Sequence, residues 1–381
     1  MKKVVVLGST GSIGEQALEV IQAAGDELRL VGISAHSSWE QACEQAKRLD
    51  VPRVAMGDPA AAERCAAERD GVLSGEEGIR ELIATSDADV VLNAITGSAG
   101  LGPTIVALTE GIDLALANKE SLVVGGALVT TLAEATGAGI IPVDSEHSAL
   151  FQLIHGERSP GSVDRLVLTA SGGPFRERED LSEVTVAEAL AHPTWEMGGR
   201  ITVDSATLFN KGLEVIEAHH LFGFGYEAID VVVHPQSIVH SLIHLNDGAS
   251  LAHLGYPDMR VPISYALHHP ERADVPMPAL DLATVGNLGF EAPDVDRFPC
   301  LRLAREAGEA GGTGPCVLNA ADEVAVAAFL DERIPFTAIP RIVEQTLAEL
   351  PAVEPTHFQD LYEVDAEARE HAASLIEGAV A

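Results

Sequence analysis

The first 150 residues alternate between two hydrophobic periods. Short apolar runs rich in β-branched residues are each followed by a stretch with the period of an amphipathic helix. The strand-like runs lie at 2–8, 28–36, 88–97 and 113–120, and the helix-like stretches at 14–25, 38–49 and 101–111. This alternation predicts βαβ units, and therefore an α/β domain with a Rossmann-type, doubly wound parallel sheet over residues 1–150.

The pattern changes near residue 151. Apolar runs at 163–173, 230–245 and 249–257 predict strands of a second sheet, and 205–223 has the period of one long helix. We therefore expect a central α+β domain at 151–285.

Proline- and aspartate-rich residues follow at 270–299 with little periodicity, and we place a linker at 286–300. After it the helical period returns. Helical stretches at 316–332, 338–350 and 360–380 predict a C-terminal α-helical bundle within 301–381.

The charge is strongly negative. Lysine and arginine number 24 against 58 aspartates and glutamates, a formal net charge of −34. Such a field repels nucleic acid and anionic membranes, so neither is an expected partner. An acidic, lysine-poor surface is typical of proteins adapted to high salt, and an acidic proteome explains it equally well.

Cysteines and apolar runs indicate the compartment. The four cysteines form no C-x-x-C pair, so neither a zinc cluster nor a disulfide framework is indicated, and a reducing cytoplasm fits. The apolar run Val4–Leu7 is too short for a signal peptide, and no stretch is long enough to span a bilayer. We expect a cytoplasmic protein.

A glycine-rich loop, residues 8–14, lies between the first predicted strand and helix. Backbone N–H groups at such a helix start can hold a pyrophosphate, although many glycine-rich loops are only turns. The second strand ends in His36-Ser37-Ser38, with no acid before Glu40. Without a carboxylate to repel a 2′-phosphate, the loop favours NADP over NAD.

Two carboxylates follow an apolar run in Val-Asp-Ser-Glu-His-Ser, residues 143–148. In an extended chain Asp144 and Glu146 face the same way, and paired carboxylates suit Mg²⁺ or Mn²⁺. The alternative is structural: Asp144 or Ser145 caps a helix whose N-terminus favours Glu146.

The predicted helix at 205–223 carries an unusual polar stripe. Asn210 and Glu214 are four residues apart and share a face, Lys211 lies beside them, and Ser205 is a plausible N-cap. This pattern indicates ligand binding, whereas the simpler alternative is a solvated face with a Lys–Glu pair.

Two further loops have binding chemistry. Ser171-Gly172-Gly173 follows a strand and can form a backbone concavity for an anion. His192 precedes Trp195, Met197 and Gly198-Gly199, and a Trp in a glycine-hinged loop indicates a lid, although a single Trp is more often in a core.

Eight segments in order resemble the 1-deoxy-D-xylulose 5-phosphate reductoisomerase family. They are LGSTGSIG, LANKE, VDSEHSA, ASGGPFR, HPTWEMGG, VDSATLFNKGLE, HPQSIVHS and LNAADE. The resemblance extends from the first strand to the C-terminal bundle. It implies an NADPH-dependent oxidoreductase that uses a divalent cation to convert 1-deoxy-D-xylulose 5-phosphate to 2-C-methyl-D-erythritol 4-phosphate, the committed step of the non-mevalonate isoprenoid (MEP) pathway.

The resemblance also implies site residues. The metal ligands would be Asp144, Glu146 and Glu214, and the catalytic residues Lys119, Glu146, His192 and Glu214. Ser145, Lys119 and His192 would contact the substrate's carbonyl and hydroxyl groups, and its phosphate would be held by Ser171, Ser205, Asn210 and Lys211. Trp195 and Met197 would form the lid over the substrate. The cofactor would be lined by Gly8, Thr10, Gly11, Ser12, Ile13, Gly14, His36, Ser37, Ser38, Asn118, Glu120 and Gly198. The family is homodimeric, and the central sheet is the expected interface.

The sequence departs from the family at two places. His36-Ser37-Ser38 stands where the family often has Gly-Lys/Arg-Asn, which weakens the expected preference for NADPH. Gly199-Arg200 stands where a basic or prolyl pair is common, which changes the expected stiffness of the lid. Two other functions compete: a metal-independent NADP-dependent dehydrogenase of a small phosphorylated substrate, and a non-catalytic dinucleotide-binding protein.

Overall fold

The computed structural model describes residues 1–159, 161–195 and 197–380. It divides into two compact units, each formed from several segments of the chain. Unit 1 comprises Met1–Ser121, Val129–Ser148 and Asp258–Pro278, and unit 2 comprises Leu122–Leu128, Ala149–Pro257 and Ala279–Ala381. The functional domain boundaries expected from the sequence stay a prediction.

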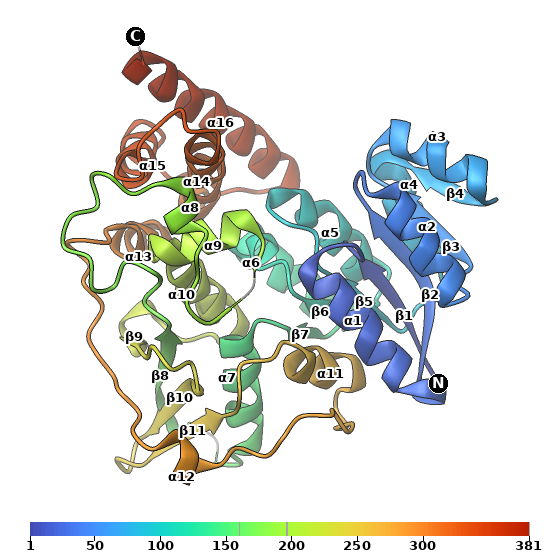
Figure 1. Cartoon of the computed structure of the whole chain (residues 1–381), viewed down its shortest axis with the longest axis horizontal. Helices are drawn as coiled ribbons and strands as arrows, with labels where there is room; N and C mark the ends of the chain where they lie inside the picture. Colours follow the sequence, from blue (N-terminus) through green and yellow to red (C-terminus); the bar gives the residue numbers. More distant parts are fainter. Residues whose placement is uncertain (160, 196, 381) are drawn as a thin grey trace. The chain divides into compact units, whose positions relative to one another are not determined.

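Unit 1 contains a seven-stranded sheet in which every neighbouring pair is parallel (Figure 1). Its strands, in sheet order, are β4 (Val72–Ser74), β3 (Arg53–Met56), β2 (Leu28–Ala35), β1 (Lys2–Leu7), β5 (Val90–Asn93), β6 (Asp113–Leu116) and β7 (Ile140–Pro142). The order reverses beside β1, which pairs with β2 on one side and β5 on the other. The predicted Rossmann-type α/β fold is confirmed, and the reversal is the point where ligands bind in such sheets.

Helices connect these strands and bury the sheet. They are α1 (Ser12–Ala23), α2 (Trp39–Arg48), α3 (Pro59–Glu68), α4 (Gly75–Thr85), α5 (Leu101–Thr109), α6 (Glu120–Thr136) and, from later in the chain, α11 (Arg260–His268). Helices α1 and α11 contact each other, as do α4 and α5. Val4, Val5 and Val6 in β1 are 0% exposed, as expected for a parallel strand covered on both faces.

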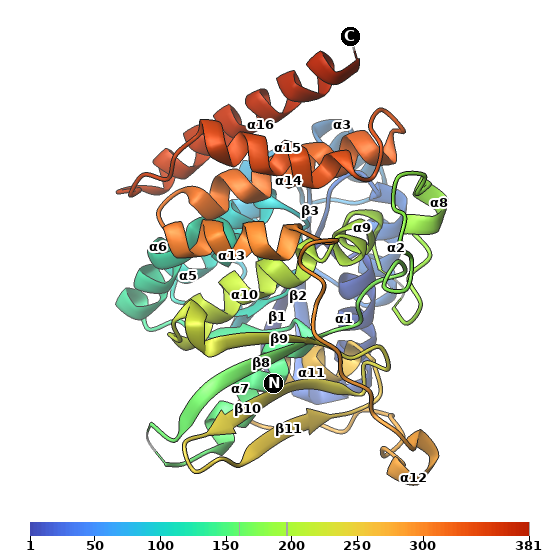
Figure 2. The same cartoon turned by 90° about the vertical axis from the view of Figure 1, so that its left-hand side faces the viewer.

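Unit 2 contains a four-stranded sheet, whose strands run across the lower part of Figure 2. Its order is β11 (Ser250–Leu254), β10 (Val239–Leu245), β8 (Val163–Ala170) and β9 (Ile229–Val233). Strands β8 and β9 are parallel, and β10 is antiparallel to both β8 and β11. The mixed sheet confirms the expected α+β character, but the apolar run 230–245 is two strands, separated by a turn at His234–Ile238.

Four long helices follow in unit 2: α13 (Cys300–Ala310), α14 (Gly314–Leu330), α15 (Ala338–Glu349) and α16 (Phe358–Val380). They share one hydrophobic core with α10 (Phe209–Phe222). Gly212 allows α10 and α13 to approach closely, because a Cβ there would overlap the Cβ of Ala304. The expected helical bundle is therefore present, with α13 in addition to the three predicted stretches.

The prediction of one long helix at 205–223 was wrong. The structure has α9 (Gly199–Ala206) and α10, separated by Leu208 in the left-handed conformation with φ 61°. Ser205 therefore lies in the last turn of α9 and is not an N-cap. The short helix α12 (Leu282–Val285) directly precedes the predicted linker at 286–300, and Glu291 within that linker forms a backbone bridge with Val233. Among the described residues, none of the helices combines the length and apolar character needed to cross a bilayer.

Candidate functional site

The glycine-rich loop of unit 1 is built so that only glycine fits at two positions. Gly8 has φ 76°, and a Cβ there would lie 2.6 Å from the carbonyl oxygen of Ala94. A Cβ on Gly14 would overlap the carbonyl oxygen of Gly8 and lie 2.6 Å from the Cα of Ser9. Gly11, at the N-cap of α1, has no side chain to accept the first N–H groups of the helix. The helix start can therefore receive an anion.

The end of β2 borders this loop. Ser34 accepts a hydrogen bond from the Gly8 backbone N–H at 3.3 Å, and the Ser9 N–H donates to the Ser34 carbonyl at 2.8 Å. The next three side chains, His36, Ser37 and Ser38, are exposed. This segment adjoins the glycine loop, as a contact to the adenosine ribose of a dinucleotide requires.

Asn118 and Glu120, after β6, organise the loop that follows β5. The Asn118 side-chain amide donates to the carbonyls of Ile95 and Gly97 at 2.6 and 2.9 Å. Glu120 accepts the Gly97 backbone N–H at 3.0 Å. Both predicted cofactor residues therefore lie at the carboxyl end of β6, against the loop that follows the adjacent parallel strand β5, and Rossmann-type sheets bind ligands at this edge.

Lys119 and Asp144 form an ion pair within unit 1. Their side chains are 6% and 13% exposed, so both charges are largely removed from water. Removing either partner would leave a buried charge uncompensated, which is strongly unfavourable. The pair fixes the Asp144 carboxylate at the start of α7 (Ser145–Gly156).

Glu146 lies in the first turn of α7, where the helix dipole favours a carboxylate. The Ser145 hydroxyl donates a hydrogen bond to the Glu146 carboxylate. Because α7 begins at Ser145, the strand alternation expected for Asp144 and Glu146 was wrong, and helix geometry sets their directions. The alternative that these residues only begin a helix describes the position of Glu146 correctly. It gives no reason for a buried lysine beside Asp144.

In unit 2, the imidazole of His192 links the lid segment to the Ser171 turn. Its Nδ1 accepts the backbone N–H groups of Thr194 and Trp195 at 3.1 and 2.9 Å. Nε2 therefore carries the proton and donates to the Ser171 hydroxyl at 3.0 Å. Burial lowers the pKa of His192, which favours this neutral form.

The Ser171 hydroxyl is prepared to donate. It accepts from His192 and from the Gly173 backbone N–H at 3.3 Å, so its own proton can be directed at a ligand. Gly172 and Gly173 have φ of 83° and 68°, the left-handed conformation that turns backbone N–H groups inward. A Cβ on Gly173 would lie 2.8 Å from the Ser205 carbonyl oxygen, so this turn packs directly against α9.

The polar stripe on α10 is buried. Lys211 and Glu214 are 4% and 1% exposed and form an ion pair, and the Asn210 amide donates to Glu214 at 2.6 Å. The predicted sharing of a helix face by Asn210 and Glu214 is confirmed. The solvated-face alternative was wrong, because both side chains are buried. The pair has therefore paid a desolvation penalty that an exposed Lys–Glu pair would avoid.

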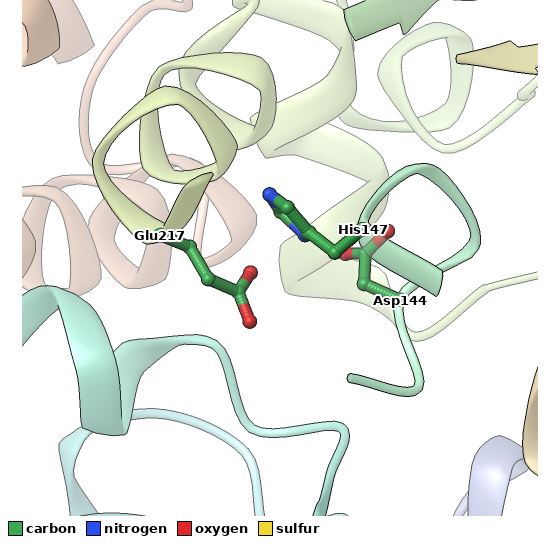
Figure 3. A group of neighbouring side chains, drawn as sticks. All are labelled: Asp144, His147 and Glu217. Carbon is green, nitrogen blue, oxygen red and sulfur yellow. The ribbon is translucent and has the colours of Figure 1, made fainter. Parts of the chain in front are cut away.

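Two residues outside the predicted set, His147 and Glu217, are fully buried. Figure 3 shows His147 and Asp144 at the start of α7, and Glu217 on α10. A signal was present in both cases, since His147 lies inside the 143–148 motif and Glu217 follows Glu214 by three residues. By donor chemistry, Asp144, Glu146 and His147 in unit 1 are possible ligands of a divalent cation, and so are Glu214 and Glu217 in unit 2.

The described residues of the lid segment, 192–195 and 197–198, lie in no helix or strand. Trp195 and Met197 are half-buried and Gly198 is exposed, while Glu196 lies outside the described residues. Because the Trp195 indole is only half-buried and lies in an irregular loop, it is not a core residue, and the lid role stays a prediction.

Comparisons with known proteins agree on one family. Three family models match: 1-deoxy-D-xylulose 5-phosphate reductoisomerase at residues 4–126, its C-terminal domain at 140–222, and the DXP reductoisomerase C-terminal domain at 254–371. The Gloeobacter violaceus 1-deoxy-D-xylulose 5-phosphate reductoisomerase is 49% identical over 99% of this chain and 98% of its own. The chain belongs to the 1-deoxy-D-xylulose 5-phosphate reductoisomerase family. The Geobacillus kaustophilus family member is 50% identical over 99% of this chain and all of its own.

Solved structures of the reductoisomerase family match over both units. The Zymomonas mobilis enzyme in complex with NADPH has a TM-score of 0.90 and 40% identity, with 99% of each chain covered. A second reductoisomerase, in complex with NADPH, fosmidomycin and magnesium, has a TM-score of 0.92 and 38% identity over 99% of this chain and 98% of its own.

Proposed function

We propose that the protein converts 1-deoxy-D-xylulose 5-phosphate to 2-C-methyl-D-erythritol 4-phosphate with NADPH and Mg²⁺ or Mn²⁺, the committed step of the non-mevalonate pathway. It is an NADPH-dependent oxidoreductase that also isomerises its substrate. One observation carries the proposal: a reductoisomerase bound to NADPH, fosmidomycin and magnesium matches 99% of this chain with a TM-score of 0.92.

Asp144 and Glu146 of unit 1 and Glu214 of unit 2 are the proposed metal ligands. Three carboxylates form the hard oxygen set that Mg²⁺ and Mn²⁺ prefer. Lys119 forms an ion pair with Asp144, and Ser145 orients Glu146 through its hydroxyl. Bound there, the cation would supply Lewis-acid chemistry to adjacent substrate oxygens.

The phosphate of the substrate is assigned to Ser171, Ser205, Asn210 and Lys211. The buried ammonium of Lys211 provides a fixed positive charge, and the Ser171 hydroxyl and Asn210 amide are positioned as donors. The Ser171–Gly173 turn adds backbone N–H groups. Because Glu214 already pairs with Lys211, the same contact connects phosphate recognition to the proposed metal ligand.

Lys119, Glu146, His192 and Glu214 are the proposed catalytic residues. Lys119, Ser145 and His192 bind the carbonyl and hydroxyl oxygens of the ketose, as the donors at these positions allow. They hold the substrate in one orientation while its carbon skeleton rearranges to the intermediate aldehyde, for which bound NADPH would supply the hydride. Trp195 and Met197 close over it and exclude water.

NADPH is assigned to the carboxyl edge of the unit 1 sheet. The pyrophosphate lies on the helix start at Gly8, Thr10, Gly11, Ser12, Ile13 and Gly14, and the nicotinamide side is lined by Asn118, Glu120 and Gly198. His36, Ser37 and Ser38 contact the 2′-phosphate. Their exposure and the absence of a carboxylate at this position support the assignment.

The remaining assignments concern domains and assembly. Residues 1–150 bind NADPH, 151–285 form the catalytic and dimerisation domain, 286–300 are a linker, and 301–381 form the C-terminal helical domain. The protein is a cytoplasmic homodimer joined through the four-stranded sheet. The edge strand β11 supports this interface, because Leu251 and Leu254 are 38% and 37% exposed. Its charge of −34 disfavours nucleic acid and anionic membranes as partners.

The test is NADPH oxidation with 1-deoxy-D-xylulose 5-phosphate, after EDTA treatment, with and without added Mn²⁺, and with the product identified by NMR. Metal-dependent oxidation that yields 2-C-methyl-D-erythritol 4-phosphate is the expected result. Oxidation insensitive to EDTA would indicate a metal-independent dehydrogenase instead. No oxidation at any salt concentration would leave a non-catalytic dinucleotide-binding protein.

A further inference from the structure

The segment Leu-Asn-Ala-Ala-Asp-Glu, residues 318–323 of α14, has no part in the chemistry described above. In the structure three of its polar side chains surround Arg200, which lies in the first turn of α9. The guanidinium of Arg200 donates to Glu323 at 2.9 Å and to Asn319 at 3.0 Å, and its Nη2 lies 3.6 Å from a carboxylate oxygen of Asp322. One motif of α14 therefore holds one side chain of α9.

This contact is removed from water. Asn319 and Asp322 are 0% exposed and Asp204, also on α9, is 3% exposed. The Arg200 Nε lies 3.5 Å from Asp204. Burial and the neighbouring Asp204 carboxylate raise the pKa of Asp322 well above its ordinary value. The Arg200 guanidinium therefore lies among carboxyl groups of both α9 and α14.

A second arginine holds the far side of the motif. Arg369 on α16 lies 2.6 Å from Glu323 and 2.6 Å from Asp365. Glu323 is thus fixed from two directions, and Asn319 donates to it at 3.0 Å. The partner that receives Arg200 is itself held rigidly by two helices of the C-terminal bundle.

Such a network specifies position more than it adds stability. Buried ion pairs contribute little compared with apolar packing of the same volume, but breaking one is costly. A planar guanidinium reaches Asn319 and Glu323 together in only a narrow range of orientations, which a lysine cannot reproduce. The first turn of α9 is therefore set by α14.

Helix α9 carries this constraint to the proposed phosphate site. It has eight residues, with Arg200 in its first turn and Ser205 in its last. The Ser205 carbonyl packs against Gly173, whose Cβ would lie only 2.8 Å away, and Gly173 donates to Ser171. A tilt of α9 about its first turn would separate Ser205 from the Ser171–Gly173 turn.

We propose that Arg200 is a positioning residue for phosphate recognition, because residues 318–323 hold its guanidinium and thereby set where α9 presents Ser205 beside the Ser171–Gly173 turn. The inference rests on the proposed function, since it takes these residues as the phosphate site. It assigns a role in substrate affinity to the C-terminal helices, which supply none of the proposed ligands.

The test compares Arg200→Lys and Glu323→Gln with Arg302→Lys. Arg302 is a matched control on α13, since it pairs only on the surface, with Glu306 and Glu344. In both test variants the KM for 1-deoxy-D-xylulose 5-phosphate should rise about tenfold, as expected for loss of one charged hydrogen bond. The KM for NADPH should be unchanged and kcat should stay within about twofold. The control should change none of these values.

A double variant and a binding measurement complete the test. The two substitutions remove the same contact, so Arg200→Lys with Glu323→Gln should raise the substrate KM no more than either alone. Additive effects, or equal changes in the KM for NADPH, would overturn the inference. Calorimetric titration with inorganic phosphate tests the role of Arg200 independently of the proposed reaction. Weaker phosphate binding by Arg200→Lys supports this role even if the unchanged protein shows no turnover. Equal phosphate binding by both proteins, or none by the unchanged protein, would overturn it.

Discussion

Unit 1 presents backbone groups at the carboxyl ends of parallel strands, whereas unit 2 presents charged side chains from within a helical core. In unit 1 the backbone of the glycine loop packs so closely at Gly14 that a side chain there would not fit. The charged site residues of unit 1, Lys119 and Asp144, lie at strand ends. In unit 2, Lys211 and Glu214 are buried in the middle of α10. Sites of the first kind depend on local turn geometry, and sites of the second kind depend on the whole core.

The comparison predicts that charge changes in unit 2 have the largest effect. Glu214→Gln should keep the fold and NADPH binding but reduce kcat/KM by about 10³-fold or more, because it removes a proposed metal ligand. Steady-state kinetics at saturating Mn²⁺ measure this. Glu217→Gln, one turn further on α10, is the matched variant. If Glu217→Gln alone abolished turnover, the metal would belong with Asp144, His147 and Glu217 instead.

The half-buried His220 of unit 2 predicts a loss of stability in acid. Burial, with the neighbouring His219, lowers the pKa of His220 to about 4 from 6.5. Between these values the unfolded chain binds a proton that the folded protein does not. The contribution of His220 to the free energy of unfolding is therefore fully present above pH 6.5. It decreases as the pH falls, by about 3 kcal/mol at pH 4.

Urea unfolding of His220→Gln between pH 7 and pH 4 checks this. The variant should lose about 3 kcal/mol less over that range than the unchanged protein. Replacement of the exposed His155 is the comparison. Parallel pH profiles for the unchanged protein and His220→Gln would show that this imidazole is not the cause.

A smaller effect is expected when only the phosphate charge partner is removed. Lys211→Met should raise the substrate KM about 100-fold, or about 2.7 kcal/mol, because a buried ammonium would no longer face the phosphate. The KM for NADPH should stay the same. Lys47→Met, in the last turn of α2 in unit 1, should leave both constants unchanged. A rise in the KM for NADPH in Lys211→Met would indicate that the Lys211 charge serves cofactor binding and not the substrate phosphate.

Backbone crowding in unit 1 should give the smallest of these changes. Gly14→Ala forces the Cβ against Gly8 and Ser9, so the loop must shift, and the KM for NADPH should rise about tenfold. Gly156→Ala has open space and should not alter it. Fluorescence titration with NADPH measures both variants, and normal affinity in Gly14→Ala would remove the glycine loop from the cofactor site.

The sequence predicted unit 1 better than unit 2 for a physical reason. Parallel strands and their connecting helices have local hydrophobic periods, so β1, β2, β5 and β6 could be anticipated from them. Strands β3 and β4 were missed, because runs of four and three residues are too short to show a period. The break between α9 and α10 could not, because Leu208 adopts a left-handed conformation that its own side chain disfavours and that only the surrounding core explains. Helix α11 was missed because it follows β11 in sequence but packs in unit 1.

The candidate site shows the same division. Residue chemistry selected Asp144 and Glu146, although through a strand geometry that the structure replaces with a helix start. Burial of His147 and Glu217 could not be read from the sequence, because it depends on which face of each helix meets the core. Arg200 was noted only as a departure in the lid, since its partners on α14 lie more than a hundred residues further along the chain.

Asp144, Glu146 and Glu214 are the proposed metal ligands. The most direct measurement is the anomalous signal of Mn²⁺ in crystals grown with NADPH and the metal. We expect a single strong peak coordinated by the carboxylates of Asp144, Glu146 and Glu214. A peak on Asp144, His147 and Glu217, or a peak that lacks Glu214, would show that this ligand assignment is wrong.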